Sequence, residues 1–355
     1  MLEYIARGAI EQLRNVVASL SHSNVLLLHG KLSYSVCGAQ AIIPPLLAGI
    51  NVSEWADFST NPKVEDVQRG RAMVVGRNID LIIAVGGGSV IDIAKLISLK
   101  EDGSALPIIA IPTTAGTGSE ATQFAVLWDG DKKSSVDNEK LLPKCAIIDP
   151  IFLENQPADS ATAPLADALG QAIESYWCVN STDESKLYAS QAISLILPTI
   201  GAVKPDYLAR ALGAHLAGKA INITRTTAAH SISYAFTAYS GLAHGHAVML
   251  TLPTFFIFNS GVSDGDCLDT RGVEYVQCTM DELNKMLGCS NAVQSATRLA
   301  DIAHTLGLEL QLGKLGYDDK ACEYIVQHGF NPQRVKNNPR LLTETALATI
   351  IGNLC

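Results

Sequence analysis

The sequence lacks several features that would place it in a special class of proteins. None of its eight cysteines forms a Cys-x-x-Cys pair, so free thiols are expected in place of a disulfide framework or a zinc–cysteine site. No run approaches about eighteen uncharged apolar residues, and the charged N-terminal stretch has no apolar signal core. We therefore expect a cytoplasmic protein that does not span a membrane.

The sequence is also poor in positive charge. Its 26 Lys and Arg residues stand against 35 Asp and Glu residues, which gives a net charge of −9. A nucleic acid needs a basic surface to bind, so it is not an expected partner. A small anionic substrate is still compatible with this charge, because it needs only a few local cations.

The pattern of apolar residues changes along the 355-residue chain, which is long enough for two domains. In the first part, helix-like stretches such as 64–77 alternate with short apolar runs at 25–28, 81–85 and 108–111. This alternation predicts a parallel sheet that is covered on both faces. Beyond residues 150–157 helix-like segments dominate, at 164–179, 183–203, 207–222 and 227–239. We expect an α/β dinucleotide-binding domain over residues 1–155 and an all-α domain over residues 156–355.

A glycine-rich loop follows the second apolar run. Residues 81–95 read LIIAVGGGSVIDIAK, so a buried strand leads into Gly86, Gly87, Gly88 and Ser89 before a helix begins. Glycines allow the backbone to pass close to a pyrophosphate, and the helix N-terminus directs N–H groups at it. The motif is not Gly-x-Gly-x-x-Gly, and a tight turn without a ligand is the alternative interpretation.

A second loop follows the third apolar run. Residues 108–120 read IIAIPTTAGTGSE, and a helix is expected after them. Hydroxyls that could reach ribose and phosphate oxygens belong to Thr113, Thr114, Thr117 and Ser119. Two such loops, each at the carboxyl end of a strand, predict a dinucleotide site.

These loops resemble those of the iron-containing (group III) alcohol dehydrogenases. The similarity rests on GGGSVIDIAK and IPTTAGTGSEAT and extends over nearly the whole chain. Other matching positions, in family order, are Asn61-Pro62, Leu142-Pro143, Asp149-Pro150, Asp167-Ala168-Leu169, His244-Gly245 and Asn338-Pro339-Arg340. The resemblance implies a dehydroquinate synthase-like fold and a metal-dependent NAD(P)-dependent oxidoreductase. It also adds Asn61 and Asp92 to the expected cofactor-binding residues.

The choice of nicotinamide cofactor depends on the end of the first apolar run, VLLLHGKLSYS. Family members that prefer NAD tend to have an acidic residue after this strand, which binds the ribose 2′-hydroxyl, whereas this chain has Gly30. Glycine leaves room for a 2′-phosphate, and Lys31, Ser33 and Ser35 supply a cation and hydroxyls. We expect NADPH, with NADH as the alternative. Lys31 could instead be a solvated lysine in a turn.

The resemblance implies a metal held by one aspartate and three histidines. The matching residues are Asp167, Gln171, His230 and His244, and the spacing of four places Asp167 and Gln171 on one helix face. Gln171 stands where the family has histidine, and an amide oxygen is a harder, weaker ligand. We expect a divalent metal, Fe²⁺ by family, with Zn²⁺, Mn²⁺ or Mg²⁺ as alternatives. Loss of the metal site is the competing interpretation.

The chain departs from the family again at the expected proton donor. Tyr234 replaces a histidine that many members carry near the substrate, and tyrosine titrates near about pH 10. His246, two residues past His244, could donate the proton instead, or it could be a buried structural histidine. Tyr234 and His246 are therefore the candidate catalytic residues. The implied reaction transfers hydride from the nicotinamide to an aldehyde carbon, while the metal acts as a Lewis acid on its oxygen.

Two cations near the metal ligands indicate an anionic substrate. Residues 216–230 read LAGKAINITRTTAAH, with Lys219 and Arg225 where the family commonly has apolar residues or glycine. Cations beside a metal are unfavourable unless an anion binds there. Arg225, with the hydroxyls of Thr226 and Thr227, could hold a phosphonate or carboxylate. Alternatively, both cationic side chains reach solvent.

The glutamine and the added cations are most similar to one branch of the family. That branch reduces phosphonoacetaldehyde to 2-hydroxyethylphosphonate in phosphonate biosynthesis. A general NADPH-dependent reductase of carboxylate or neutral aldehydes is the nearest alternative. A lyase like dehydroquinate synthase and a relative that only binds nucleotide are further ones. We expect a small anionic aldehyde as the partner, with a homodimer as a candidate assembly.

Overall fold

The computed structural model describes residues 1–20, 22–130 and 132–354, and this part of the chain divides into two compact units. The first unit contains residues 1–161 and 206–218, and the second contains residues 162–205 and the chain from 219 onward. A single boundary near residue 155 would have assigned 206–218 to the second unit. Among the described residues, no helix combines the length and the hydropathy that crossing a bilayer requires.

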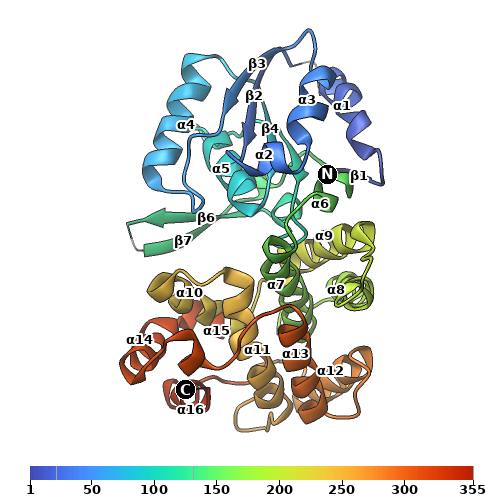
Figure 1. Ribbon diagram of the computed structural model, residues 1–355. Coiled ribbons are helices and arrows are strands. Elements are labelled where there is room, and N and C mark those ends of the chain that lie inside the picture. Colours follow the sequence, from blue (N-terminus) through green and yellow to red (C-terminus); the bar gives the residue numbers. More distant parts are fainter. Residues whose placement is uncertain (21, 131, 355) are drawn as a thin grey trace. The chain divides into compact units, whose positions relative to one another are not determined.

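A parallel sheet forms the centre of the first unit (Figure 1). Its strands in chain order are β1 (Leu2–Ile5), β2 (Asn24–His29), β3 (Asn51–Trp55), β4 (Leu81–Gly86), β5 (Ile108–Pro112) and β8 (Cys145–Ile148). In space the order is β1-β8-β5-β4-β2-β3, and every neighbouring pair is parallel. The three apolar runs predicted from the sequence therefore form the adjacent strands β2, β4 and β5.

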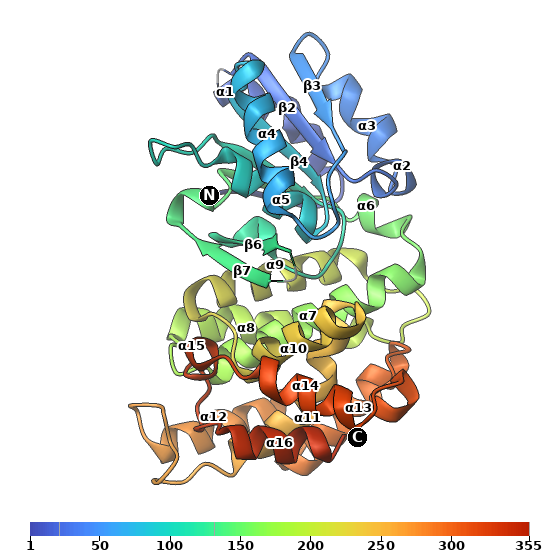
Figure 2. The same cartoon turned by 90° about the vertical axis from the view of Figure 1, so that its left-hand side faces the viewer.

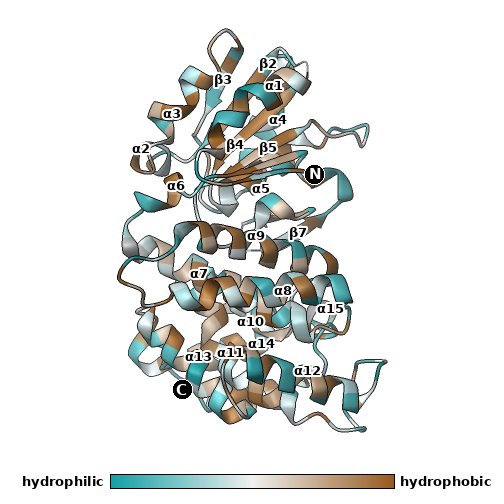
Figure 3. Cartoon of the chain, turned by 90° about the vertical axis from the view of Figure 1, so that its right-hand side faces the viewer, coloured by the Kyte–Doolittle hydropathy of each residue, from teal (hydrophilic) through white to brown (hydrophobic). Residues whose placement is uncertain are grey.

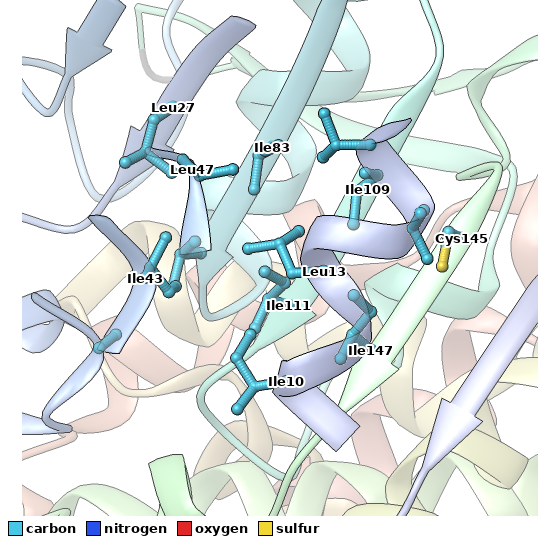
Figure 4. Close-up of a cluster of buried hydrophobic side chains, with 14 of the residues drawn as sticks. Ile10, Leu13, Leu27, Ile43, Leu47, Ile83, Ile109, Ile111, Cys145 and Ile147 are labelled. Carbon is cyan, nitrogen blue, oxygen red and sulfur yellow. The ribbon is translucent and has the colours of Figure 1, made fainter. Parts of the chain in front are cut away.

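These three strands are apolar at nearly every position because helices cover both faces of the sheet, as their brown colour in Figure 3 shows. Leu27, Ile83 and Ile109 are register partners that pack on one face with helices α1 (Leu13–Leu20) and α3 (Ala39–Leu46) (Figure 4). Their neighbours Leu26 and Ile82 pack on the opposite face with helices α4 (Val64–Gly76) and α5 (Gly88–Ser98). Each fully buried Leu or Ile contributes about 1.5–3 kcal/mol relative to an exposed one.

The prediction of a helix after residues 108–120 is wrong. The chain forms a single 3₁₀ turn at Ser119–Ala121 and then an antiparallel hairpin of β6 (Phe124–Asp129) and β7 (Lys132–Asp137). Aromatic and β-branched residues flank an Asp129-Gly130 pair, and this combination favours a hairpin over a helix. The unit also contains two short helices, α2 (Ser33–Val36) after β2 and α6 (Ile151–Glu154) after β8.

Among its described residues, the second unit consists of helices and connecting segments without a β-strand, as predicted. Its helices are α7 (Ala158–Trp177), α8 (Asp183–Ile196), α10 (Ala228–Ser240), α11 (His244–Ser260), α12 (Val273–Met286), α13 (Ala292–Thr305), α14 (Asp319–Gly329), α15 (Pro332–Val335) and α16 (Glu344–Gly352). Helix α9 (Tyr207–Thr224) is divided between the units after residue 218. Helices α10, α11, α14 and α16 pack side by side (Figure 2).

The described cysteines follow the expectation with one difference, and Cys355 lies outside the described residues. Those described as free thiols are Cys37, Cys145, Cys178, Cys267, Cys278 and Cys289. Cys322 is disulfide-bonded, so the expectation of free thiols is wrong at that position.

Candidate active site

The order of the strands locates the expected dinucleotide site in the first unit. From β2 the chain moves outward to β3 and then returns to β4 on the other side of β2, so the direction of winding reverses between β2 and β4. In open parallel sheets, ligands bind beyond the carboxyl ends of the strands at such a reversal. Gly30 directly follows β2, and Gly86 ends β4. The predicted cofactor residues at these two strands therefore flank the reversal.

The two predicted cofactor loops are packed against each other. A Cβ atom on Gly87 would lie 3.1 Å from Thr114 Oγ1, and one on Gly88 would lie 2.7 Å from Thr117 Oγ1. Side chains at these glycines would push the loops apart, which is a second reason for glycine besides access to a phosphate. Helix α5 begins at Gly88, so its first turn, with Ser89, presents N–H groups of the kind that bind anions.

A buried network anchors the second loop to helix α5. Ser119 Oγ donates to Asp92 Oδ1 at 2.5 Å, and the Val126 N–H donates to Asp92 Oδ2 at 2.9 Å. Lys95 is fully buried, and its Nζ lies 3.0 Å from both Ser119 Oγ and Thr122 Oγ1 and 2.9 Å from the Phe124 carbonyl oxygen. Burial lowers the pKa of Lys95 to about 8. Asp92 and Ser119 thus fix the loop, while their contact with the cofactor stays a prediction.

The residues expected to contact the cofactor's ribose and its 2′-phosphate lie at the surface. Lys31 follows Gly30, and its Nζ makes an ion pair with Asp57 Oδ1 at 2.7 Å. Ser33 begins helix α2, and both it and Asn61 are exposed. Thr113 directly follows β5 and is fully buried. Lys31 therefore lies in an exposed ion pair, and its contact with the cofactor stays a prediction.

Three of the four predicted metal ligands converge in the second unit. Asp167 lies on α7, His230 in the first turn of α10, and His244 at the start of α11. Their ligand atoms all lie within 4.8 Å of one another, with His230 Nε2 3.0 Å and His244 Nε2 3.8 Å from Asp167 Oδ1. Gln171 is buried on α7, one turn after Asp167. Its contact with a metal stays a prediction.

Gly245 allows helix α11 to lie close to helix α7. A Cβ atom on Gly245 would lie 1.9 Å from the Ala163 carbonyl oxygen and 2.8 Å from the Asp167 backbone nitrogen. Only a residue without a side chain allows the first turn of α11 to touch the backbone of α7 at this point. The neighbouring His244 is thereby placed beside Asp167.

Glu174 is a functional residue that the sequence reasoning missed. It is fully buried on α7, seven residues after Asp167 and therefore on the same helix face. Its carboxylate accepts hydrogen bonds from His230 Nδ1, from Thr227 Oγ1 at 2.6 Å and from the Ala229 N–H at 2.9 Å. It therefore satisfies the N-terminus of α10 and orients the His230 imidazole at the same time.

The contacts of His230 fit a metal ligand. Burial acts to lower the pKa of His230, but the carboxylates of Glu174 and Asp167 outweigh burial and raise the pKa to about 9. At this pKa both ring nitrogens carry a proton, so Nδ1 donates to Glu174 and Nε2 donates to Asp167, and a metal would take the place of the Nε2 proton. A carboxylate and two imidazole nitrogens around one point, with an amide oxygen one helical turn away, fit a divalent cation.

The two candidate proton donors have different surroundings. The Tyr234 ring stacks on the His244 ring, with centroids 5.4 Å apart and planes 6° apart. Ser233 Oγ lies 3.2 Å from His244 Nδ1, on the side of that ring away from Nε2. His246 Nε2 instead donates to the Glu309 carbonyl oxygen at 2.7 Å. This bond fits the structural interpretation of His246, and Tyr234 is the candidate in contact with a metal-ligand residue.

The expected substrate cations lie at the end of helix α9. Lys219 Nζ sits over the Tyr188 ring, 4.7 Å from its centroid. Arg225 follows the last residue of α9 and has a left-handed backbone with φ 67°, and its Nη1 donates to the Asn222 carbonyl oxygen at 2.7 Å. The Thr226 carbonyl accepts from Asn337 Nδ2 at 3.2 Å. Both cations are partly buried, so the interpretation that they simply reach solvent does not describe them fully.

Comparison with known proteins agrees with this arrangement. Residues 4–150 match the model of the iron-containing alcohol dehydrogenases, and residues 162–354 match that family's C-terminal model. The chain is 32% identical to the phosphonoacetaldehyde reductase of Streptomyces viridochromogenes over 303 residues, which cover 77% of this chain and 75% of that protein. It is 26% identical to the NAD-dependent methanol dehydrogenase of Bacillus methanolicus over 373 residues, 98% of this chain and 97% of the other.

A solved structure is similar over the full length. The sulfoacetaldehyde reductase of Bifidobacterium kashiwanohense in complex with NAD⁺ superimposes with a TM-score of 0.87 at 25% identity, covering 100% of this chain and 96% of that one. The chain therefore belongs to the iron-containing alcohol dehydrogenase family. It is an oxidoreductase that interconverts an aldehyde and an alcohol with a nicotinamide cofactor and an iron-type metal.

Proposed function

We propose that this protein reduces a small aldehyde that carries an anionic group. The substrate we propose is phosphonoacetaldehyde, the product is 2-hydroxyethylphosphonate, and the reductant is NADPH. This reaction belongs to phosphonate biosynthesis. The observation that supports an anionic substrate most directly is the backbone conformation of Arg225.

Arg225 occupies a conformation that suits glycine. Its φ of 67° lies in the left-handed region, which it shares among the described non-glycine residues with Asn78. Asparagine tolerates this region, whereas other side chains there cost roughly 1–2 kcal/mol. A glycine would adopt the same turn without strain. An arginine at this position indicates that its guanidinium has a role that outweighs the strain, and binding an anion is the role that its chemistry fits.

The position of Arg225 fits a short substrate. Two residues later, Thr227 donates to Glu174, and Glu174 holds the ligand His230. The backbone around Arg225 is fixed by Thr224 Oγ1, which donates to the Arg225 carbonyl at 2.6 Å, and by the Arg225 N–H, which donates to Ile221 at 2.8 Å. In phosphonoacetaldehyde the aldehyde carbon is two bonds from phosphorus. Such a substrate requires the anion site and the metal to be close neighbours.

Two of the similar proteins act on aldehydes of this kind. Their names denote phosphonoacetaldehyde and sulfoacetaldehyde, which are both two-carbon aldehydes with an oxyanion group. The methanol dehydrogenase is named for a neutral substrate and is 26% identical to this chain, against 32% for the phosphonoacetaldehyde reductase. These names support a small anionic aldehyde as the substrate of the present chain.

Different residues of this chain have different roles in the proposed reaction. The loops after β2, β4 and β5 would bind and orient the cofactor, and Asp167, Gln171, His230 and His244 would hold the metal. When bound, the metal supplies Lewis acidity at the aldehyde oxygen and the reduced nicotinamide supplies the hydride.

Other side chains prepare these groups. Glu174 keeps the proton on His230 Nδ1, so that Nε2 stays a ligand atom. Tyr234, stacked on His244, is our candidate for delivering the proton to the product oxygen. Arg225 would fix the phosphonate and so orient the carbonyl carbon.

The test is a comparison of aldehydes. NADPH oxidation is followed with phosphonoacetaldehyde, succinic semialdehyde and propanal, each with and without a chelator. We expect the highest kcat/KM for phosphonoacetaldehyde and loss of turnover with the chelator. Similar kcat/KM values for all three aldehydes would favour a general aldehyde reductase. Absence of NADPH consumption with every aldehyde would contradict the proposed reaction as a whole.

A further inference from the structure

A buried imidazole lies between two carboxylates in the first unit, and it belongs to neither the metal cluster nor the predicted cofactor residues. His215 is fully buried in helix α9, and its Nδ1 lies 3.2 Å from Glu120 Oε1. Its Nε2 lies 3.6 Å from Glu3 Oε1 on β1. Glu120 is itself buried and belongs to the 3₁₀ turn that ends the second cofactor loop. An ionic group from α9 is therefore attached to this loop.

The same face of α9 touches the loop backbone directly. Gly118 has a left-handed φ of 60°, and a Cβ atom on it would lie 2.4 Å from Gly218 Cα and 3.1 Å from the Ala214 carbonyl oxygen. Gly218 is three residues after His215 and therefore on the same helix face. The Gly118–Gly218 contact and the His215–Glu120 pair thus dock two successive parts of the loop on one strip of α9.

Burying the charges of His215 and Glu120 costs free energy, and stabilisation of the fold does not explain why the chain has this pair. Replacing a buried ion pair by well-packed apolar residues is often neutral or stabilising. A glycine–glycine contact also gives up side-chain packing. Both features make sense if the exact position of the loop matters, since residues 113–119 supply the hydroxyls expected at the cofactor.

We propose that His215 and Glu120 are positioning residues for the nicotinamide cofactor, holding the loop of residues 113–120 on helix α9 in the conformation that binds it. The proposal rests on the cofactor role of that loop. It assigns to α9 a function in cofactor affinity that is separate from the metal and from the hydride-transfer step.

Under this proposal, cofactor affinity also depends on pH. Burial acts to lower the pKa of His215, but the carboxylates of Glu120 and Glu3 outweigh burial and raise the pKa above its ordinary 6.5. The charged pair then holds the loop fully below pH 6.5, and this stabilisation of the loop is lost as the pH rises through the raised pKa of His215. The charged groups that face the imidazole are Glu120 from the 3₁₀ turn and Glu3 from β1.

The experiment measures the Kd of NADH and NADPH for the full-length, metal-loaded protein by cofactor fluorescence, from about pH 6 to about pH 9. The variants are His215→Gln, Glu120→Gln and the double substitution. His22→Gln is the matched control, because His22 makes a more exposed pair with Asp80, at 3.7 Å, in the same unit. We expect each single variant to raise the Kd about tenfold at low pH, which corresponds to about 1.4 kcal/mol. The double variant should raise it no further, because both changes break one interaction.

Further readouts separate positioning from mere stability. At saturating cofactor the kcat of the variants should stay near that of the wild type, whereas the KM for the cofactor rises. His215→Gln should also remove part of the pH dependence of Kd. A lowered melting temperature with an unchanged Kd would overturn the proposal, as would additive effects of the two substitutions.

Two other failures are distinguishable. If His215→Gln does not fold, Glu120→Gln, which keeps the imidazole, still decides the question through its Kd. If the wild type itself binds neither NADH nor NADPH, the cofactor role of the loop is wrong, and the proposal falls with it.

Discussion

The two units bury charged groups in opposite ways. In the first unit, the three protons of the Lys95 ammonium group face two hydroxyls and a carbonyl, so the group is satisfied within the protein. In the second unit, the carboxylates of Asp167 and Glu174 surround a single imidazole, that of His230, and a second imidazole, that of His244, lies nearby. The first arrangement is complete and stabilises a loop. The second has an excess of negative charge and converging ligand atoms, so it is completed by a cation.

This contrast shows that a buried polar cluster is not by itself a catalytic site. Both clusters contain groups with displaced pKa values, about 8 for Lys95 and about 9 for His230. The difference is whether the protein supplies every partner. Changing one residue in each cluster should therefore have different consequences: loss of chemistry in the second unit and loss of stability in the first.

The largest effect is expected for Asp167→Ala. Removing the carboxylate that both histidines approach should abolish metal binding and turnover. NADPH affinity should be retained, because the predicted cofactor loops lie in the first unit. Metal content by elemental analysis, turnover and NADPH fluorescence titration test the three parts. The control is Asp301→Ala, which changes an exposed aspartate on α13 and should keep both metal and activity.

Gln171→His is the complementary change in the same cluster. It would restore the ligand type of the family and should tighten the binding of a transition metal such as Fe²⁺ or Zn²⁺. Full activity of a metal-free wild type, confirmed by elemental analysis, would refute the role assigned to this cluster.

Lys95→Met should lower the free energy of unfolding. Removing the buried donor leaves its acceptors unsatisfied, which typically costs about 1–3 kcal/mol. The folded pKa of Lys95 lies near 8, below its ordinary 10.5, so between these values the unfolded chain binds more protons than the folded one. The contribution of Lys95 to stability therefore increases from about pH 8 to 10.5 and is constant below that range.

Urea unfolding at neutral pH and near about pH 9.5 measures this effect. The difference in unfolding free energy between wild type and Lys95→Met should be larger at the higher pH. A difference that does not change with pH would mean that burial does not displace the pKa of Lys95 as described.

The sequence predicted those parts of the molecule that depend on local pattern. The strands β2, β4 and β5 were recognisable because each is a continuous apolar run, and Asp167, His230 and His244 because they match a family motif. Glu174 and His215 were missed for a common reason. A glutamate or histidine within a helix is usually solvated, and only the tertiary fold shows that Glu174 meets the N-terminus of α10 and that His215 meets Glu120. The hairpin β6–β7 was missed because the hydroxyl-rich loop before it suggested a second strand–helix unit.

Arg225→Ala tests whether the second unit also recognises an anion. A charge-assisted hydrogen bond contributes roughly 1.5–3 kcal/mol, so kcat/KM for phosphonoacetaldehyde should fall about ten- to a hundredfold. The loss should be much smaller for propanal, because the cation has no partner there. Arg225→Gly is the control for the backbone, since glycine relieves the left-handed strain and likewise removes the guanidinium. Equal losses on charged and neutral aldehydes would show that Arg225 supports the fold or the metal site instead.

The smallest effect is expected at the cofactor's ribose, where the first unit has an exposed ion pair in contrast to the buried network of Lys95. Lys31 is bound to Asp57, but Arg69 also donates to that carboxylate at 3.1 Å, so Asp57 keeps a partner if Lys31 turns to a 2′-phosphate. Exposed pairs contribute little to stability, whereas a bond to a phosphate dianion is charge-assisted, so the exchange should favour NADPH.

Lys31→Ala should therefore raise the KM for NADPH by about three- to tenfold and leave the KM for NADH nearly unchanged. Gly30→Asp should shift preference toward NADH by repelling the phosphate. A Cβ atom on Gly30 would lie 2.2 Å from Ser33 Oγ, so this variant also requires the Ser33 side chain to rotate, and Gly30→Asp combined with Ser33→Ala removes that obstacle. The ratio of kcat/KM for the two cofactors measures each change. A wild type that already strongly prefers NADH, with a ratio that Lys31→Ala does not alter, would show that Lys31 stays with Asp57 and that this carboxylate excludes the 2′-phosphate.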